Sequence, residues 1–211
     1  MSIGRIIRGD ACVREGASWL STEVPQFAAA LQQTGPLPLR LRPEGFDQLL
    51  SAIISQQVSV ASAAAIWNRM QDANLTEPAR ILEATDDGLR AVGLSRQKIR
   101  YARALADAGI DFAALREMPT DQVIVRLIEV PGIGAWTAEI YAMFSLGRAD
   151  VFAPGDLALQ EAARILFDLP ERPKERVFRN MAESWSPWRS VAARILWAYY
   201  RVATTQRGIS D

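Results

Sequence analysis

The feature that most constrains the fold is a pair of apolar helical segments joined by the turn Pro131-Gly132-Ile133-Gly134. Two glycines that bracket one aliphatic residue favour a turn with a positive φ angle and a close approach of the backbone to its neighbours. Thr120 and Asp121 mark the start of the first helix. Apolar residues recur at helical spacing on both sides of the turn, at Val123, Leu127 and Ile128 before it and at Trp136, Ile140 and Phe144 after it. The stretch 120–146 therefore predicts a helical hairpin.

This turn has two interpretations. It can be an ordinary connection between two packed helices, which needs no ligand. Alternatively, because glycines carry no side chain, the backbone N–H groups that open the second helix can reach an anion such as a phosphate group. Contacts of that kind carry no information about base sequence. The spacing of the residues is compatible with both.

The rest of the chain predicts further helices. No segment shows the period-two alternation of a half-buried strand, so the predicted fold class is all-α. Residues 1–20 could form a short arm or a first helix, and Ser21 or Thr22 is expected to cap a helix over 25–33. Later helices are expected over 45–57, 61–70, 77–84 (capped by Thr76), 86–92 (capped by Thr85), 96–106 (capped by Ser95), 157–167, 177–184 and 191–202, with 204–211 as a frayed tail.

Composition excludes several kinds of site. The 211 residues include one cysteine, Cys12, and no histidine. A disulfide framework within the chain, an iron–sulfur cluster and histidine-based catalysis are therefore excluded. No run of 18 uncharged apolar residues and no secretory pattern is present, so we expect no membrane partner. The formal net charge of zero means that any nucleic-acid contact must use a local patch, for which the abundant arginines are suited.

A single acidic residue closes the loop that follows the hairpin. This loop runs Val151-Phe152-Ala153-Pro154-Gly155 and ends at Asp156, directly before the apolar periodic segment 157–167. An Asp in that position is a standard N-cap signal. A carboxylate at a helix start can also take part in chemistry, and the two roles are compatible.

Three segments resemble one known family. LIEVPGIGAWTAEIYAMFSLGRADVFAPGDLALQ (127–160) resembles the helix-hairpin-helix plus Gly/Pro-Asp signature of the DNA glycosylase superfamily. AIISQQVSVASA (52–63) resembles a segment of the alkyl-base glycosylases, and WSPWRSVAARILW (185–197) resembles the last-helix signature of the DNA-3-methyladenine glycosylase II type. The resemblance covers roughly residues 38–204.

The resemblance implies a helical fold of two lobes with a central cleft, formed by a single compact glycosylase domain over 1–211. One lobe would span about 45–145, including the hairpin, and the other about 1–44 together with 150–211. The β-rich N-terminal domain of some bacterial relatives is not expected.

The resemblance also assigns roles to residues. It makes Asp156 the catalytic carboxylate, and Trp136, Tyr141 and Trp197 the candidates for the base pocket. Trp185 and Trp188 are expected in the core instead, because tryptophans usually pack. Gln57, with Gln56 beside it, would be the wedge that fills the gap left by a flipped base.

Contacts to the DNA backbone are implied at two places. In the hairpin they would come from Gly132, Ile133, Gly134, Ala135 and Thr137. The segment GLSRQKIRY (93–101) resembles a family segment near the backbone and suggests Arg96, Gln97 and Lys98, although a solvated basic face would look the same. The backbone carbonyls of Ile128, Val130 and Ile133 could hold a structural Na⁺ or K⁺; no other cofactor is expected.

The implied function is that of a monofunctional DNA glycosylase of base excision repair. It would hydrolyse the N-glycosidic bond of flipped-out alkylated purines in duplex DNA, such as 3-methyladenine, 7-methylguanine or ethenoadenine. Bifunctional relatives carry a lysine in the second hairpin helix where this chain has Trp136, so no AP-lyase activity is expected. The expected partner is damaged double-stranded DNA, and the protein would be a cytoplasmic monomer at the bacterial nucleoid. The alternatives are a DNA-binding module without catalysis, and a glycosylase for uracil or oxidised guanine.

Overall fold

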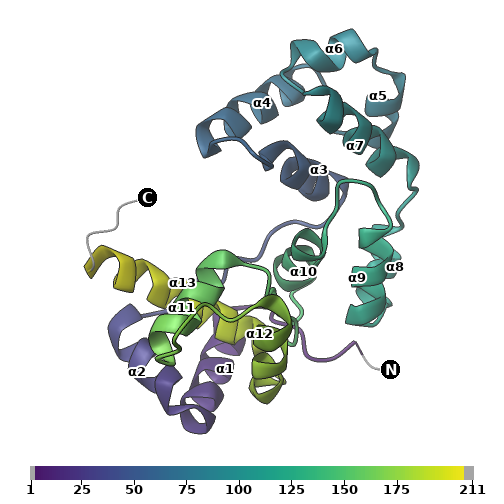
Figure 1. Cartoon of the computed structure of the whole chain (residues 1–211). Helices are drawn as coiled ribbons and strands as arrows, with labels where there is room; N and C mark the ends of the chain where they lie inside the picture. The colour runs from purple at the N-terminus through teal and green to yellow at the C-terminus, as the bar shows by residue number, and fades with distance from the viewer. Residues whose placement is uncertain (1–2, 207–211) are drawn as a thin grey trace. The chain divides into compact units, whose positions relative to one another are not determined.

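A computed structural model describes residues 3–206 and is built from helices (Figure 1). In chain order they are α1 (Asp10–Glu23), α2 (Pro25–Thr34), α3 (Phe46–Ser55), α4 (Val60–Asp72), α5 (Pro78–Glu83), α6 (Asp86–Ala91), α7 (Arg96–Asp107), α8 (Phe112–Glu117), α9 (Thr120–Ile128), α10 (Ala135–Phe144), α11 (Leu157–Leu166), α12 (Glu175–Met181), the 3₁₀ helix η1 (Ala182–Trp185) and α13 (Arg189–Gln206). The β-type pairing within these residues is an isolated bridge between Ile6 and Arg148. The predicted all-α class is thus confirmed. Among the described helices, none combines the length and the apolarity that a membrane crossing requires.

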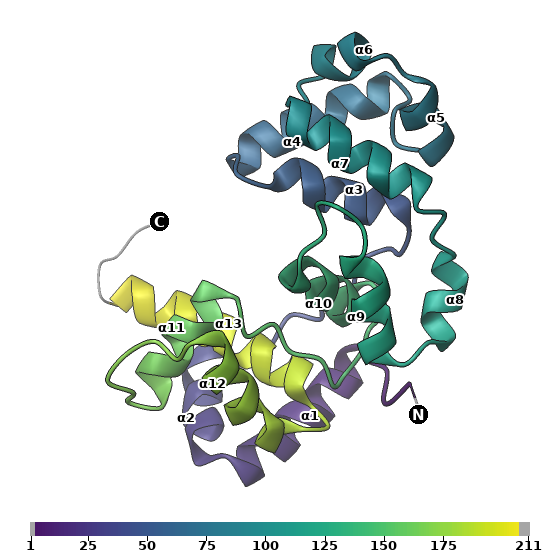
Figure 2. The same ribbon diagram turned by 45° about the vertical axis from the view of Figure 1, so that its right-hand side comes forward.

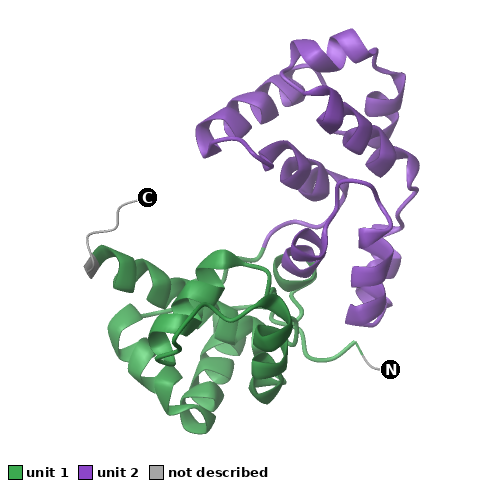
Figure 3. Ribbon diagram, viewed as in Figure 1, with its two compact units in different colours: residues 1–41, 142–211 green, residues 42–141 purple. Residues whose placement is uncertain are grey.

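The chain divides into two compact units (Figure 3). Unit 1 comprises residues 1–41 and 142–211, and unit 2 comprises residues 42–141. The division falls inside α10, between Tyr141 and Ala142. Asp156 and the last-helix motif therefore belong to unit 1, whereas the hairpin turn and the glutamine pair belong to unit 2.

The core of unit 1 is built around α13. This helix packs against α1, α2 and α11, as both views of the ribbon show (Figures 1 and 2). Next to it, edge-to-face and stacked rings form a cluster centred on Trp185, with Phe27, Phe152, Phe167 and Phe178 around it. Trp188 lies against Gly16 so closely that a Cβ there would be 2.7 Å from the indole ring. Both tryptophans are buried, which confirms their expected place in the core.

Unit 2 is organised by α7, which packs against α3, α5 and α6. Its inner face carries the buried residues Ile99, Ala102, Leu105 and Ala106, which the helical spacing of the sequence picks out. The hairpin follows α8 in the same unit, with Val123 and Leu127 buried on α9. Ile128, which the periodicity places with them, is 45% exposed because the helix ends there and the chain turns away.

Three helices start where the sequence predicts a side-chain N-cap. The side chains of Thr85, Ser95 and Asp156 accept hydrogen bonds from the N–H groups of Gly88, Lys98 and Leu159 and cap α6, α7 and α11. These three predicted caps are confirmed.

Other predicted boundaries are wrong. Ser21 and Thr22 lie inside α1, where their hydroxyls donate to the carbonyls of Ala17 and Ser18, and α2 starts at Pro25 without a side-chain cap. Thr76 does not cap α5, whose N-cap residue is Glu77. Residues 204–206 continue α13 rather than fray, because the hydroxyls of Thr204 and Thr205 bond back to carbonyls one turn earlier; residues 207–211 lie outside the described part.

Tyr141 supports the start of α3 within unit 2. Its hydroxyl oxygen accepts a hydrogen bond of 3.0 Å from the N–H of Gly45, the N-cap residue of α3, which has no side-chain cap. The phenol is 4% exposed, and burial raises the pKa of Tyr141 to about 12. The neutral phenol is therefore the form that the folded unit favours.

We predict that Tyr141→Phe changes how stability depends on pH. Folding raises the pKa of this phenol, so its contribution is complete below pH 10 and is lost as the pH rises towards 12. By pH 11 the wild type should have lost about 1.4 kcal/mol more unfolding free energy, relative to pH 9, than the variant. Urea unfolding at both pH values measures this, and absorbance of phenolate gives the pKa directly. Identical pH dependence of the two proteins would contradict the prediction.

Candidate functional site

Asp156 is held at the N-terminus of α11 by hydrogen bonds to one carboxylate oxygen. Oδ1 accepts from the N–H of Leu159 at 3.0 Å and from the indole Nε1 of Trp197 at 3.3 Å. The loop before it, 151–154, is buried and fixes where the helix begins, while Asp156 itself is half-buried. The positive end of the helix dipole favours a carboxylate in this place. The carboxylate is thus restrained in direction on a residue that is only partly buried.

The aromatic surroundings of Asp156 come from α10 and α13. Trp197 is half-buried, and its ring lies 5.7 Å from that of Phe144, centroid to centroid, with 33° between the ring planes. On Phe144 lies the guanidinium of Arg194, 4.8 Å from the ring centre. Trp197 therefore presents an aromatic surface beside the carboxylate, backed by a second ring. Such a surface can stack on a planar, electron-poor ligand.

Arg194 supports the Phe144–Trp197 ring pair from within the core of unit 1. It is buried, and its hydrogen bonds go to neutral acceptors: the carbonyl of Leu39 and the carbonyl and hydroxyl of Ser190. Burial lowers the pKa of Arg194 to about 10, so the group stays charged at neutral pH. It joins α13 to the extended connection that precedes α3, which stabilises the part of α13 that carries Trp197.

In unit 2, the two glycines of the hairpin turn differ. Gly132 has φ of +95°, and a Cβ on it would lie 2.4 Å from Cγ of Tyr101. Gly134 lacks a positive φ and has no neighbour within 4 Å of an added Cβ. The predicted turn with positive φ and close packing is therefore formed at Gly132, while the backbone at Gly134 is open.

The other predicted hairpin residues also differ in exposure. Ala135 is exposed and Trp136 is 46% exposed, whereas the side chains of Ile133 and Thr137 are buried. A contact from Thr137 to an outside anion would thus use the backbone, whereas the N–H of Ile133 is already bonded within the turn. The carbonyl of Val130 accepts from the N–H of Ile133 at 3.0 Å, which closes the turn.

The glutamine pair occupies the connection between α3 and α4. The amide Nε2 of Gln56 donates to the carbonyl of Gly132 at 2.9 Å. Gln57 is exposed and has φ of +57°, a conformation that costs a non-glycine residue about 1–3 kcal/mol. The structure thus joins the predicted wedge loop to the hairpin turn, 76 residues apart in the chain.

A depression of about 240 Å³ lies at this junction and is lined by both polar and apolar residues. It is formed by Gln56, Gln57, Val58, Ile66, Gly93, Ser95, Gln97, Lys98 and Tyr101. The Nζ of Lys98 donates to the carbonyl of Ile54 at 2.5 Å, and burial lowers the pKa of Lys98. Arg96 is exposed at the start of α7. The sequence interpretation missed Tyr101, since nothing local links it to Gly132.

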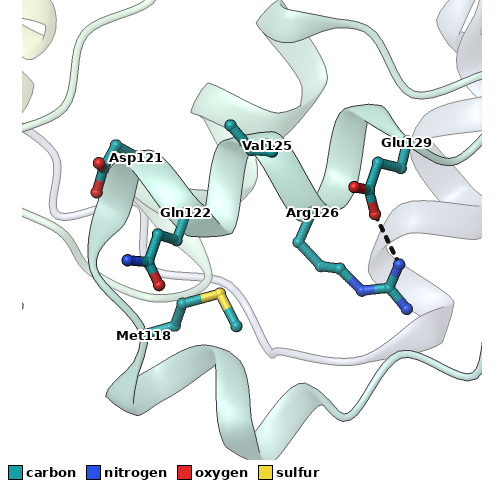
Figure 4. A pocket seen from close by; sticks show the side chains of 6 residues that line it. All are labelled: Met118, Asp121, Gln122, Val125, Arg126 and Glu129. Atoms are coloured by element: carbon teal, nitrogen blue, oxygen red, sulfur yellow. Dashed lines mark hydrogen bonds and ion pairs between the residues drawn. The ribbon is translucent and has the colours of Figure 1, made fainter.

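A second depression, of about 260 Å³, lies on the hairpin helix α9 (Figure 4). Its lining is Met118, Asp121, Gln122, Val125, Arg126 and Glu129, and Arg126 donates to Glu129 at 2.8 Å. None of the residues predicted for catalysis, the base pocket or DNA contacts belongs to it. Among the described residues, no group of three or more histidine, cysteine or acidic side chains is placed to hold a metal.

Comparisons with known proteins identify the family. Residues 50–187 match the family described as HhH-GPD superfamily base excision DNA repair protein. The chain belongs to this superfamily, as its hairpin and Pro-Gly-Asp loop predict.

Within this superfamily, several similar proteins are DNA-3-methyladenine glycosylases. DNA-3-methyladenine glycosylase 1 of Schizosaccharomyces pombe is 30% identical over 77% of this chain and 75% of its own length. DNA-3-methyladenine glycosylase 2 of Escherichia coli is 29% identical over 73% of this chain and 57% of its own length. Among solved structures, the S. pombe enzyme Mag1 in complex with abasic DNA has a TM-score of 0.75, with 30% identity and coverage of 87% of this chain and 95% of that one. A DNA-3-methyladenine glycosidase from Bacillus halodurans has a TM-score of 0.80, with 29% identity and coverage of 96% and 94%. The predicted resemblance to alkyl-base glycosylases is confirmed.

We predict that alanine is tolerated at Gly134 and not at Gly132. Gly132→Ala places a Cβ against Tyr101 and forces a strained φ, so it should lower the unfolding free energy by about 3 kcal/mol. Gly134→Ala meets open space and should change it by less than about 1 kcal/mol. Urea denaturation of both variants checks this, and an equal loss in the two would show that the close packing on Tyr101 is not what requires glycine.

Proposed function

We propose that the protein is a monofunctional DNA glycosylase that hydrolyses the N-glycosidic bond of alkylated purines, with Asp156 as the catalytic carboxylate. The observation that carries the proposal is the restraint of Asp156 Oδ1 by the Leu159 N–H and the Trp197 indole, within the motif shared by the superfamily. The relatives named as DNA-3-methyladenine glycosylases support this class of substrate.

The role of Asp156 follows from the charge that develops on the sugar during cleavage. As the glycosidic bond breaks, positive charge develops on the sugar, as in other glycoside cleavages with oxocarbenium-like transition states. A carboxylate already fixed in direction stabilises that charge without reorganising, and it can also orient or deprotonate the attacking water. Because the capping N–H and the indole hold Oδ1, the direction of the carboxylate is set before the substrate arrives.

Two features favour alkylated purines as substrates: the chain contains no histidine, and an aromatic residue lies beside Asp156. Alkylation at N3 or N7 makes a purine cationic and easily expelled, so the enzyme need not protonate it, and a chain without histidine is compatible with that route. The partly exposed Trp197 beside Asp156 can stack on a cationic base, an interaction worth about 0.5–2 kcal/mol. In unit 2, Trp136 is exposed and remains a candidate for base binding, whereas the hydroxyl of Tyr141 is used on Gly45, so Tyr141 can bind a base only through its ring.

The hairpin supplies the contact to DNA in this proposal. The open backbone at Gly134 and Ala135 lies at the start of α10, where N–H groups can bind a phosphate. Arg96, exposed at the start of α7, is suited to a second phosphate. The backbone carbonyl oxygens of Ile128, Val130 and Ile133 lie in and next to the hairpin turn. They would be the ligands of a monovalent cation with a structural role. The protein would act as a monomer on DNA in the cytoplasm.

We predict that Asp156→Asn abolishes base release and leaves the fold intact. Asparagine keeps an oxygen that can accept from Leu159 and Trp197, so only the charge is lost. Release of modified purines from methylated duplex DNA, followed by chromatography, should fall by at least about 10²-fold. Asp150→Asn is the matched control, since Asp150 pairs with Arg189 at 2.6 Å in the same unit and has no role in the reaction. Near-normal turnover of Asp156→Asn would refute the assignment. DNA binding without base release by the wild type would identify a binding module, and release of uracil or oxidised guanine alone would identify another lesion.

The proposal also predicts that no Schiff base forms with DNA. The position of the lyase lysine holds Trp136, and the Nζ of Lys98 is bonded to the carbonyl of Ile54. Borohydride added during turnover should therefore trap no covalent complex. A trapped adduct on a denaturing gel would overturn the monofunctional assignment and leave the catalytic role of Asp156 to be judged by the preceding experiment.

A further inference from the structure

Two adjacent glutamines in unit 2 have different environments. Gln57 is exposed, whereas Gln56 is half-buried and its amide donates to the carbonyl of Gly132 in the hairpin turn at 2.9 Å. The side chain of Gln56 is therefore directed at the hairpin, and of the two glutamines only Gln57 is exposed to solvent.

Helix α7 holds the same two segments together from the side. Its Tyr101 packs on Gly132, and Gln97 fixes the ring by donating its amide Nε2 to the Tyr101 hydroxyl at 2.7 Å. Its Lys98 donates to the carbonyl of Ile54 near the end of α3 at 2.5 Å. A basic side chain on the last carbonyls of a helix stabilises its C-terminus. One face of α7 thus contacts both the hairpin turn and the beginning of the loop that carries Gln57.

The hydrogen bond from Gln56 also affects the charge at the turn. A peptide carbonyl carries partial negative charge, and an unpaired one near the hairpin N–H groups would repel an approaching phosphate. A donor from Gln56 on the Gly132 carbonyl offsets this charge, whereas the N–H of the same peptide, on Ile133, bonds to Val130. The hydrogen bond from Gln56 therefore offsets an acceptor of the turn, which favours the approach of an anion to the N–H groups that open α10.

We propose that Gln56 is a positioning residue that fixes the loop 56–59 on the hairpin turn, so that Gln57 and the hairpin N–H groups meet DNA as one preformed surface. This inference rests on the proposed function for its use of DNA, and it assigns Gln56 no place in the gap left by a flipped base. In this proposal Gln57 alone is the wedge, and Gln56 holds the loop that carries it.

The first test needs no DNA. Gln56→Glu keeps the size of the side chain but replaces the donor by an acceptor, and Gln56→Ala removes both. In either variant the amide of Ile133 should exchange with solvent at least about fivefold faster, since the hydrogen bond that restrains the turn is lost. Gln57→Ala is the matched control and should leave this exchange within twofold of the wild type. Unchanged exchange in both Gln56 variants would overturn the proposal.

The second test asks whether Gln56 acts through Gln57. Affinity for a duplex with an abasic site is measured for wild type, Gln56→Ala, Gln57→Ala and the double variant. If Gln56 positions Gln57, each single change should weaken binding about tenfold, and Gln56→Ala should cost at least threefold less in the Gln57→Ala background. Additive effects would overturn the coupling. If the wild type releases no base, the proposed function fails, and amide exchange at Ile133 still tests whether Gln56 holds the loop on the turn. If the wild type releases base but the Gln56 variants leave this exchange unchanged, only the present inference fails.

Discussion

The organisation of unit 1 depends on one carboxylate oxygen that accepts two hydrogen bonds. Oδ1 of Asp156 caps α11 through Leu159 and holds the indole of Trp197, so it joins the Pro-Gly-Asp loop, one helix start and the middle of α13. Arg194, one turn before Trp197, anchors α13 to the connection at Leu39. A group that caps a helix is placed by the backbone and not only by its own rotamer. That placement makes the carboxylate suited to stabilise charge without moving.

Unit 2 meets a different constraint, the approach of two backbone segments that are distant in the chain. Gly132 permits it because a side chain there would overlap Tyr101, and Gln56 completes it with a hydrogen bond to the Gly132 carbonyl. The turn therefore depends on α7 and on the α3–α4 loop as much as on its own sequence. This junction is where unit 2 combines glycine backbone, amide groups and a basic helix start, the groups that the proposed function assigns to DNA contact.

Local patterns in the sequence predict several helix starts and buried helix positions that the structure confirms. Thr85, Ser95 and Asp156 cap the helices they precede, and Val123 and Leu127 are buried as their spacing predicts. Ser21 and Thr22 were misread because serine and threonine also bond back to carbonyls inside a helix, as they do in α1. The hydrogen bond from the Gly45 N–H to the Tyr141 hydroxyl could not be predicted from the sequence, because no local pattern reports a partner 96 residues away.

The sequence by itself determined the class of fold, the family and the position of Asp156 at the end of the loop that follows the hairpin. These follow from periodicity, from glycine and proline placement and from short motifs, all of which are properties of neighbouring residues. Only the tertiary structure decided that Trp197 donates to Asp156, that Tyr101 requires glycine at position 132, and that Gln56 and Gln57 are directed differently. Those relations join residues from separate helices, and their geometry is set by how the helices pack, which local sequence patterns do not encode.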